Sequence, residues 1–132
     1  MPFVLDASVT ACWAFDDEDH PVAARVLDRL RTDSAWAPTL WWFEVRNILV
    51  VNERRGRLTE QDTAVFLRTI SSLPIAVDRA PREETTLYLA RKHRLSVYDA
   101  SYLELAKRDG LALATLDSDL ARAARSEGMD LL

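Results

Sequence analysis

Short, continuously apolar runs that alternate with helical stretches are the feature of this 132-residue sequence that most constrains its fold. Phe3–Leu5 is the first such run, and an acidic residue follows it. Four further runs predict strands at Ala35–Ala37, Ile75–Val77, Leu111–Thr115 and Met129–Leu132. Because each run is too apolar to leave one face in water, the pattern predicts an α/β fold, with a parallel sheet of about five strands covered by helices on both faces.

Helices are predicted for the segments between these runs, from the period of their apolar residues and from their capping residues. They are expected at Ala7–Phe15, Pro21–Leu30, Pro38–Arg55, Thr59–Leu73, Pro81–Arg94, Ser96–Gly110 and Leu120–Glu127. The three glycines, Gly56, Gly110 and Gly128, each follow basic residues, which is typical of helix C-termini. No glycine cluster remains for a Walker A loop or a dinucleotide-binding fingerprint, so those nucleotide-binding classes are excluded.

The size of the chain fits a single domain over residues 1–132. The formal net charge is −4, so a polyanionic partner must be held by local contacts rather than by a general basic surface. Cys12 is the only cysteine, which excludes a disulfide framework and a cysteine-based zinc site, and it is interpreted as a small buried residue. With no leader and no long uncharged apolar run, the sequence indicates a cytoplasmic protein without a membrane segment.

Four of the 21 acidic residues lie where a merely solvated acid is not expected. Asp6 ends the first predicted strand and Asp117 follows the fourth, at the strand ends where open parallel sheets bind ligands. Glu44 lies on the apolar face of its helix, and Asp99 begins the apolar stripe of another helix. Acids are seldom retained on apolar faces, so these four are candidate catalytic residues.

The predicted topology brings the four acids to one edge of the sheet. A helix that follows a parallel strand starts at the C-terminal edge of that strand, and so does a helix that leads into the next strand. Carboxylates gathered there repel one another, so they must share protons or bind cations. Oxygen ligands suit Mg²⁺ or Mn²⁺, and such an ion activates water and neutralises phosphate charge. The residues therefore indicate metal-dependent hydrolysis of a phosphodiester.

Each of these acids also has a structural interpretation. Asp6 and Asp117 could cap the helices that follow them. Asp99 could favour the positive end of its helix dipole. Glu44 could pair with Arg46 or with a neighbouring helix.

Four short segments around the acids resemble the successive motifs of a known family. They are Val4–Ser8, Phe43–Asn47, Tyr98–Leu103 and Ala114–Asp119. In this order, and over nearly the whole chain, they are similar to the motifs of PIN-domain ribonucleases, specifically the VapC toxins of bacterial toxin–antitoxin pairs. The resemblance implies a three-layer α/β/α sandwich with strand order 3-2-1-4-5, in which the crevice lies between the first and fourth strands.

The resemblance also implies residue roles. The four acids correspond to the acidic site of the family, with Asp6 and Asp99 as the expected direct ligands of Mg²⁺ or Mn²⁺ and the other two acting through water. Ser8 and Thr115 match hydroxyl positions that orient carboxylates or waters. Ser8 could instead cap a short helix, and Thr115 could be an ordinary strand residue.

Two other acids near predicted strand ends are treated separately. Asp78 ends the third strand, which lies at the margin of the sheet in the strand order of the family, so it is not expected in the site. Asp119 could be a fifth ligand, although its place in the first turn of a helix favours a structural role.

The partners implied by the resemblance are an RNA substrate, such as a structured tRNA or rRNA, and a small antitoxin. A homodimer and a toxin–antitoxin hetero-oligomer are expected as well. The helix segment Leu40–Val51 has nine apolar residues out of twelve, more than one buried face requires. Its second face is covered by neighbouring helices, by a second subunit or by an antitoxin segment, for which Trp41 and Trp42 are candidate anchors.

Two other classes of function compete with the nuclease. A phosphoacceptor domain or a phosphatase also uses acids at strand ends, but the phosphatase needs a second acid where this chain has Ser8, and a receiver domain needs paired acids and a late lysine that are missing here. A non-catalytic PIN-like interaction module is the other alternative. The complete set of four acids is evidence against it.

Overall fold

Four parallel strands form the central sheet, in the order β3-β2-β1-β4. In this computed structural model, which describes residues 1–132, the strands are β1 (Phe3–Leu5), β2 (Ala35–Pro38), β3 (Ile75–Asp78) and β4 (Ala112–Ala114). The parallel sheet predicted from the apolar runs is confirmed. Its order agrees with the first four positions of the expected order 3-2-1-4-5.

The expected fifth strand at Met129–Leu132 is reduced to a single bridge. Leu131 pairs in parallel with Leu113 of β4, so the segment does reach the expected margin of the sheet. Met129 does not join the ladder, because its N–H still donates to the carbonyl of Ala124 over 2.9 Å in the turn that ends the last helix.

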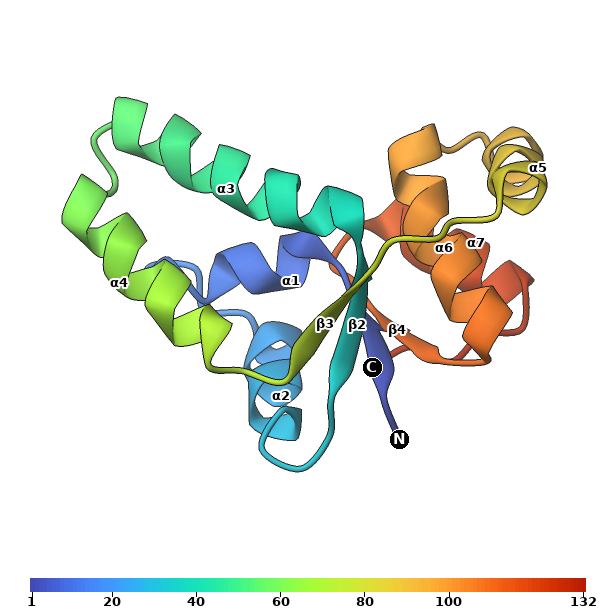
Figure 1. Cartoon of the computed structure of the whole chain (residues 1–132), viewed down its shortest axis with the longest axis horizontal. Helices are drawn as coiled ribbons and strands as arrows, with labels where there is room; N and C mark the ends of the chain where they lie inside the picture. The colour runs from blue at the N-terminus through green and yellow to red at the C-terminus, as the bar shows by residue number, and fades with distance from the viewer.

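Helices fill the connections and form the two outer layers of the sandwich. They are α1 (Ala7–Cys12), α2 (Pro21–Arg29), α3 (Thr39–Arg54), α4 (Glu60–Ser71), α5 (Glu83–His93), α6 (Val97–Asp109) and α7 (Ser118–Ser126). Figure 1 shows α1 to α4 on one side of the sheet and α5 to α7 on the other. The three-layer α/β/α class is therefore confirmed.

The helix boundaries follow local backbone chemistry. The predicted capping box at the start of α4 is present, with Thr59 N–H donating to Asp62 and Asp62 N–H donating to Thr59. Gly110 ends α6 in the left-handed conformation at φ +65°, which a side chain with a Cβ rarely adopts. The first helix is shorter than expected, because Trp13 N–H bonds the carbonyl of Thr10 three residues back and so tightens its last turn.

The helix α3 carries both buried and exposed aromatic side chains. Trp41 is buried, and its indole N–H donates to Thr10 Oγ1 of α1 over 2.9 Å. Trp42 and Phe43 are 46% and 61% exposed. The neighbouring helices therefore cover only part of the apolar surface predicted for this helix, and of the two tryptophans only Trp42 is available to a partner.

No helix of the chain combines the length and the apolar character that a membrane crossing needs.

Candidate active site

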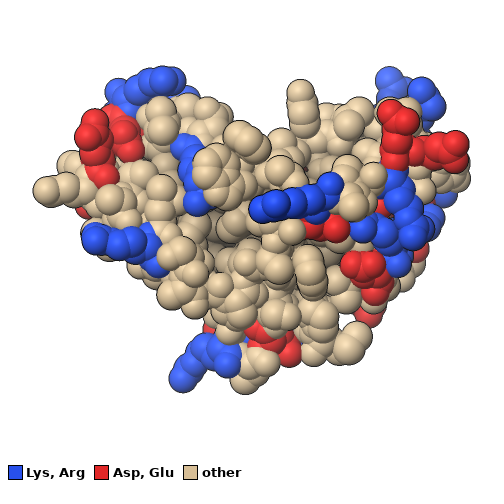
Figure 2. Space-filling model, in the orientation of Figure 1, with Lys and Arg blue, Asp and Glu red and all other residues tan.

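The C-terminal ends of β1 and β4 lie side by side, because Leu5 pairs in register with Ala114. Asp6 follows β1 directly, and its N–H donates to the carbonyl of Ala114 over 3.0 Å. Asp117 follows β4 by three residues. In Figure 2 the molecule is notched at this edge, between the lobe of α3 and α4 and the lobe of α5 and α6, and uncharged side chains cover most of the notch walls.

Asp6 is held by two hydroxyl groups. It is 6% exposed, and its Oδ2 accepts from Ser8 Oγ over 2.7 Å and from Thr115 Oγ1 over 2.6 Å. Ser8 Oγ accepts in turn from Leu116 N–H, and Thr115 Oγ1 from Asp117 N–H, each over 3.0 Å. The side chain of Asp6 makes no capping bond to α1, so the capping interpretation is wrong for this residue. Both hydroxyls instead orient its carboxylate.

The charges of the acids act on one another at this edge. Burial raises the pKa of Asp6 above its ordinary value and the charge of Asp117 raises it further, whereas the hydrogen bonds from Thr115 and Ser8 oppose the rise. Asp99 lies in the first turn of α6. Burial raises the pKa of Asp99 as well, and the charges of Asp117 and Asp6 add to the rise. The two acids expected as metal ligands therefore lie within electrostatic reach of each other.

Glu44 belongs to the same group although it comes from α3. Burial raises the pKa of its carboxyl, the hydrogen bond from Tyr102 opposes the rise, and the charges of Asp6 and Asp99 add to it. The Tyr102 hydroxyl donates to Glu44 Oε1 over 2.5 Å. Burial, followed by the nearby carboxylates, raises the pKa of Tyr102 far above its ordinary value, so the phenol remains a donor.

Other interpretations of the acids are decided by their contacts. Asp117 does cap α7, since its Oδ1 accepts from Asp119 N–H over 2.8 Å and from Leu120 N–H over 3.1 Å. Its Oδ2 takes no part in the cap. Glu44 does not pair with Arg46, whose guanidinium lies over the ring of Trp42, 4.0 Å from its centroid. It does bond a neighbouring helix, through Tyr102 of α6, so that part of the structural interpretation is confirmed.

The two acids that were set apart lie in ion pairs. Asp78 pairs with Arg108 over 2.8 Å, which agrees with its exclusion from the site. Asp119 pairs with Arg122 over 3.2 Å at the surface, where its side chain is 66% exposed. This exposed pair agrees with a structural role for Asp119, but the charge of Asp119 also raises the pKa of Asp99 after burial, Asp117 and Asp6, so Asp119 lies near the site.

The chemistry of the four acids fits a hard divalent cation. None of them forms an ion pair with a lysine or arginine, although the chain has 17 of these residues. The atoms that these acids offer to a metal ion are all carboxylate oxygens, which Mg²⁺ and Mn²⁺ prefer. In this structure no three Asp, Glu, His or Cys side chains approach closely enough to hold a metal ion together. The acids thus share one electrostatic environment without forming a closed ligand set.

The hydrogen bond between Tyr102 and Glu44 was not predicted from the sequence. One signal was present, because Tyr102 follows Asp99 by three residues and so shares its helix face. The contact with Glu44, 58 residues away, carries no local pattern that could have identified the acceptor.

The chain is similar in sequence to proteins of one known family. The sequence matches the PIN domain family over residues 3–126. Ribonuclease VapC3 from Pyrobaculum aerophilum is 32% identical over 124 residues, which are 92% of this chain and 93% of that protein. Ribonuclease VapC3 from Mycobacterium tuberculosis is also 32% identical over 124 residues, covering 91% of this chain and 85% of that protein.

Solved structures share the fold. The crystal structure of PAE2754 from Pyrobaculum aerophilum matches with a TM-score of 0.74 at 24% identity, covering 93% of this chain and 84% of that one. FitAcB from Neisseria gonorrhoeae matches with a TM-score of 0.68 at 16% identity, covering 100% and 96%. The family match and the relatives together lead to one conclusion: the chain belongs to the PIN domain family, among the VapC ribonucleases.

Proposed function

We propose that this chain is a metal-dependent endoribonuclease and the toxin of a toxin–antitoxin pair. The observation that carries the proposal is the presence of Asp6, Glu44, Asp99 and Asp117 at one sheet edge with no basic side chain paired to them. Repulsion among these carboxylates opposes folding, so their presence at one edge indicates a functional role for the negative charge. The names of the relatives support RNA as the substrate.

Asp6 and Asp99 are the proposed direct ligands of Mg²⁺ or Mn²⁺, with Glu44 and Asp117 acting through water. Asp6 suits this role because two hydroxyl donors fix its carboxylate in advance. Asp117 retains Oδ2 for a water, since the cap of α7 uses only Oδ1. A bound divalent ion would lower the pKa of a water molecule and neutralise charge on the phosphate.

The protein itself orients the reacting groups. Water held among the carboxylates attacks the phosphorus of an RNA phosphodiester in line, and the bond to the 3′ oxygen breaks. The products are a 5′-phosphate and a 3′-hydroxyl. The substrate is expected to be a structured RNA such as a tRNA or an rRNA, cleaved in the cytoplasm.

The test is cleavage of RNA by the purified protein in Mg²⁺ or Mn²⁺ and in EDTA. EDTA and the variant Asp99→Asn are both expected to abolish cleavage, with the circular dichroism spectrum unchanged. Asp28→Asn is the matched control, because the Asp28 side chain is 74% exposed and pairs only with Arg31. Cleavage that persists in EDTA, or a fully active Asp99→Asn protein, would refute the proposal.

A small antitoxin is the proposed inhibitor. Trp42 and Phe43 are exposed on α3 and directly precede Glu44 in the chain. Successive residues of a helix point about 100° apart, so a partner segment must continue from these rings around α3 to reach the acids, where an arginine on it could pair with their carboxylates. We expect a homodimer of this chain within the toxin–antitoxin complex.

A further inference from the structure

Tyr102 makes the only side-chain hydrogen bond between α3 and α6. Its side chain is fully buried, with 0% exposure, and its hydroxyl donates to Glu44 Oε1 over 2.5 Å. No ion pair joins the two helices. The place of the Glu44 carboxylate relative to α6 therefore depends on one phenol.

The same helix carries Asp99. Tyr102 follows Asp99 by three residues, so the two side chains lie on one face of α6, about one turn apart. The first turn of this helix is fixed by Ser96, whose hydroxyl accepts from Asp99 N–H over 3.0 Å. Helix α6 therefore carries Asp99 and, through Tyr102, also fixes the position of Glu44 of α3.

The donor is also of a suitable chemical kind. Glu44 is only partly buried, and Asp6 and Asp99 repel its charge, so an unrestrained carboxylate would turn away from them toward water. A neutral hydroxyl holds the carboxylate without cancelling its charge, whereas an arginine or lysine would form an ion pair and compete with a cation. The Oε2 atom of Glu44 accepts no hydrogen bond from the protein and remains open to a ligand or a water.

We propose that Tyr102 is a positioning residue of the acidic site, which holds Glu44 toward Asp6 and Asp99 so that the acids can bind a divalent cation together. The proposal rests on the proposed function of these acids as a cation site. It assigns Tyr102 no contact with substrate.

The test is Mn²⁺ binding by Tyr102→Phe, measured by isothermal titration calorimetry and independent of cleavage. Loss of an outer-shell partner of a metal site weakens metal binding by about 10- to 100-fold. Because Glu44 acts through water, the expected rise in Kd is at the lower end, about 10-fold. Higher Mn²⁺ concentrations should restore much of the cleavage rate. The matched control is Tyr98→Phe, one turn earlier on the same helix, where the side chain is 65% exposed and the hydroxyl makes no hydrogen bond. It should bind Mn²⁺ as the wild type does.

A second variant tests whether Tyr102 acts through Glu44. Glu44→Gln should weaken Mn²⁺ binding by itself, and adding Tyr102→Phe to it should weaken binding by less than twofold further. Fully additive losses would overturn the proposal, because they would show that Tyr102 acts independently of Glu44.

The remaining outcomes also decide the question. If the wild type binds Mn²⁺ and Tyr102→Phe binds it equally well, the role of Tyr102 is refuted and the proposed function stands. If the wild type binds no Mn²⁺, both fail. If Tyr102→Phe does not fold, by circular dichroism in EDTA, the hydroxyl supports the fold rather than the site, and the proposal is wrong.

Discussion

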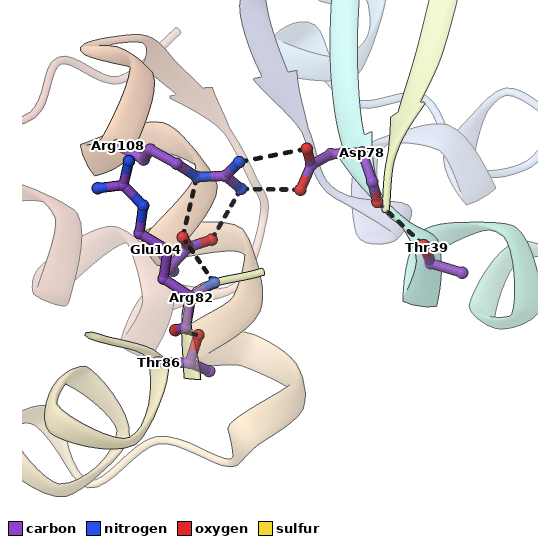
Figure 3. Close-up of polar contacts among 6 residues, drawn as sticks. All are labelled: Thr39, Asp78, Arg82, Thr86, Glu104 and Arg108. Carbon is purple, nitrogen blue, oxygen red and sulfur yellow. Dashed lines mark hydrogen bonds and ion pairs between the residues drawn. The ribbon is translucent and has the colours of Figure 1, made fainter. Parts of the chain in front are cut away.

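Replacing Arg108 by methionine should destabilise this protein more than almost any other single change of a charged residue. Figure 3 shows the guanidinium of Arg108 between Asp78, at the end of β3, and Glu104 of α6. Its Nη2 lies 2.8 Å from Asp78 Oδ2 and 3.0 Å from Glu104 Oε2. Its Nε lies 2.9 Å from Glu104 Oε1 but lacks hydrogen-bond geometry, so this contact is an ion pair only.

The expected magnitude follows from the burial of Glu104. Its side chain is 1% exposed, and its other donor is the backbone N–H of Arg82 at 3.2 Å. Without Arg108 the carboxylate would stay buried with that one neutral donor. Removing one partner of a buried ion pair costs about 3–5 kcal/mol, a large share of the roughly 5–15 kcal/mol that stabilises a typical domain.

The assay is urea unfolding followed by circular dichroism at pH 7 in EDTA, so that metal binding does not contribute. Arg31→Met is the matched control, because the ion pair of Arg31 with Asp28 joins side chains that are 80% and 74% exposed. Exposed pairs contribute about 0–1 kcal/mol, so this variant should unfold at almost the same urea concentration as the wild type.

A double variant separates loss of the pair from burial of an uncompensated charge. Glu104→Met combined with Arg108→Met should recover most of the lost stability, since two apolar side chains leave no charge behind. A loss below about 1 kcal/mol for Arg108→Met, against the 3–5 kcal/mol expected, would refute the reasoning. So would a double variant that is less stable than Arg108→Met alone.

Three further predictions test other acidic and aromatic residues. Asp99→Asn should raise the thermal unfolding midpoint in EDTA at pH 7, because it relieves repulsion of Asp99 by Asp117 and Asp6. Since the pKa of Asp99 is raised in the folded state, this gain should disappear as the pH falls below about 4, where the acid is protonated in both the folded and the unfolded state. Hydrogen bonds from Lys107 and Lys92 lower the pKa of Glu127 to about 2 from the 4.5 of a free side chain, so the stability that Glu127 contributes is present above pH 4.5 and lost as the pH falls toward 2. In unfolding titrations, Glu127→Gln should remove that part of the acid-induced loss of stability. Trp42→Ala should weaken antitoxin binding in a titration by at least tenfold while cleavage is retained, and unchanged affinity would place the antitoxin elsewhere.

The sheet and the candidate acids were predictable because their signals are local. Each strand is a short apolar run, and Asp6 lies immediately after one of them. The parallel topology then follows from the alternation with helices, and it determines which strand ends meet at one edge. Glu44 was recognisable because an acid on an apolar helix face has few structural explanations.

The contact between Tyr102 and Glu44 was not predictable, because the two residues are 58 positions apart in the chain. The role of Thr115 beside Asp6, 109 residues away, was expected only from the resemblance to the family and not from any local pattern. Met129 illustrates a different limit. Its sequence favours a strand, but the backbone turn that ends α7 uses its N–H, and local hydrogen bonding decided the outcome.

Two kinds of side chain hold the buried carboxylates of this protein, basic groups and neutral hydroxyls, and the difference bears on function. Glu104 and Glu127, which lie outside the group of four acids, are held by arginine or lysine side chains that neutralise them. Asp6 and Glu44, at the edge, are held only by the hydroxyls of serine, threonine and tyrosine. Hydroxyl donors orient a carboxylate but leave its charge in place. Thr63 holds Glu53 in the same way, between α3 and α4. At the sheet edge, however, the acids held by hydroxyls also repel one another, and an arrangement that keeps this repulsion is the one expected where a cation must bind.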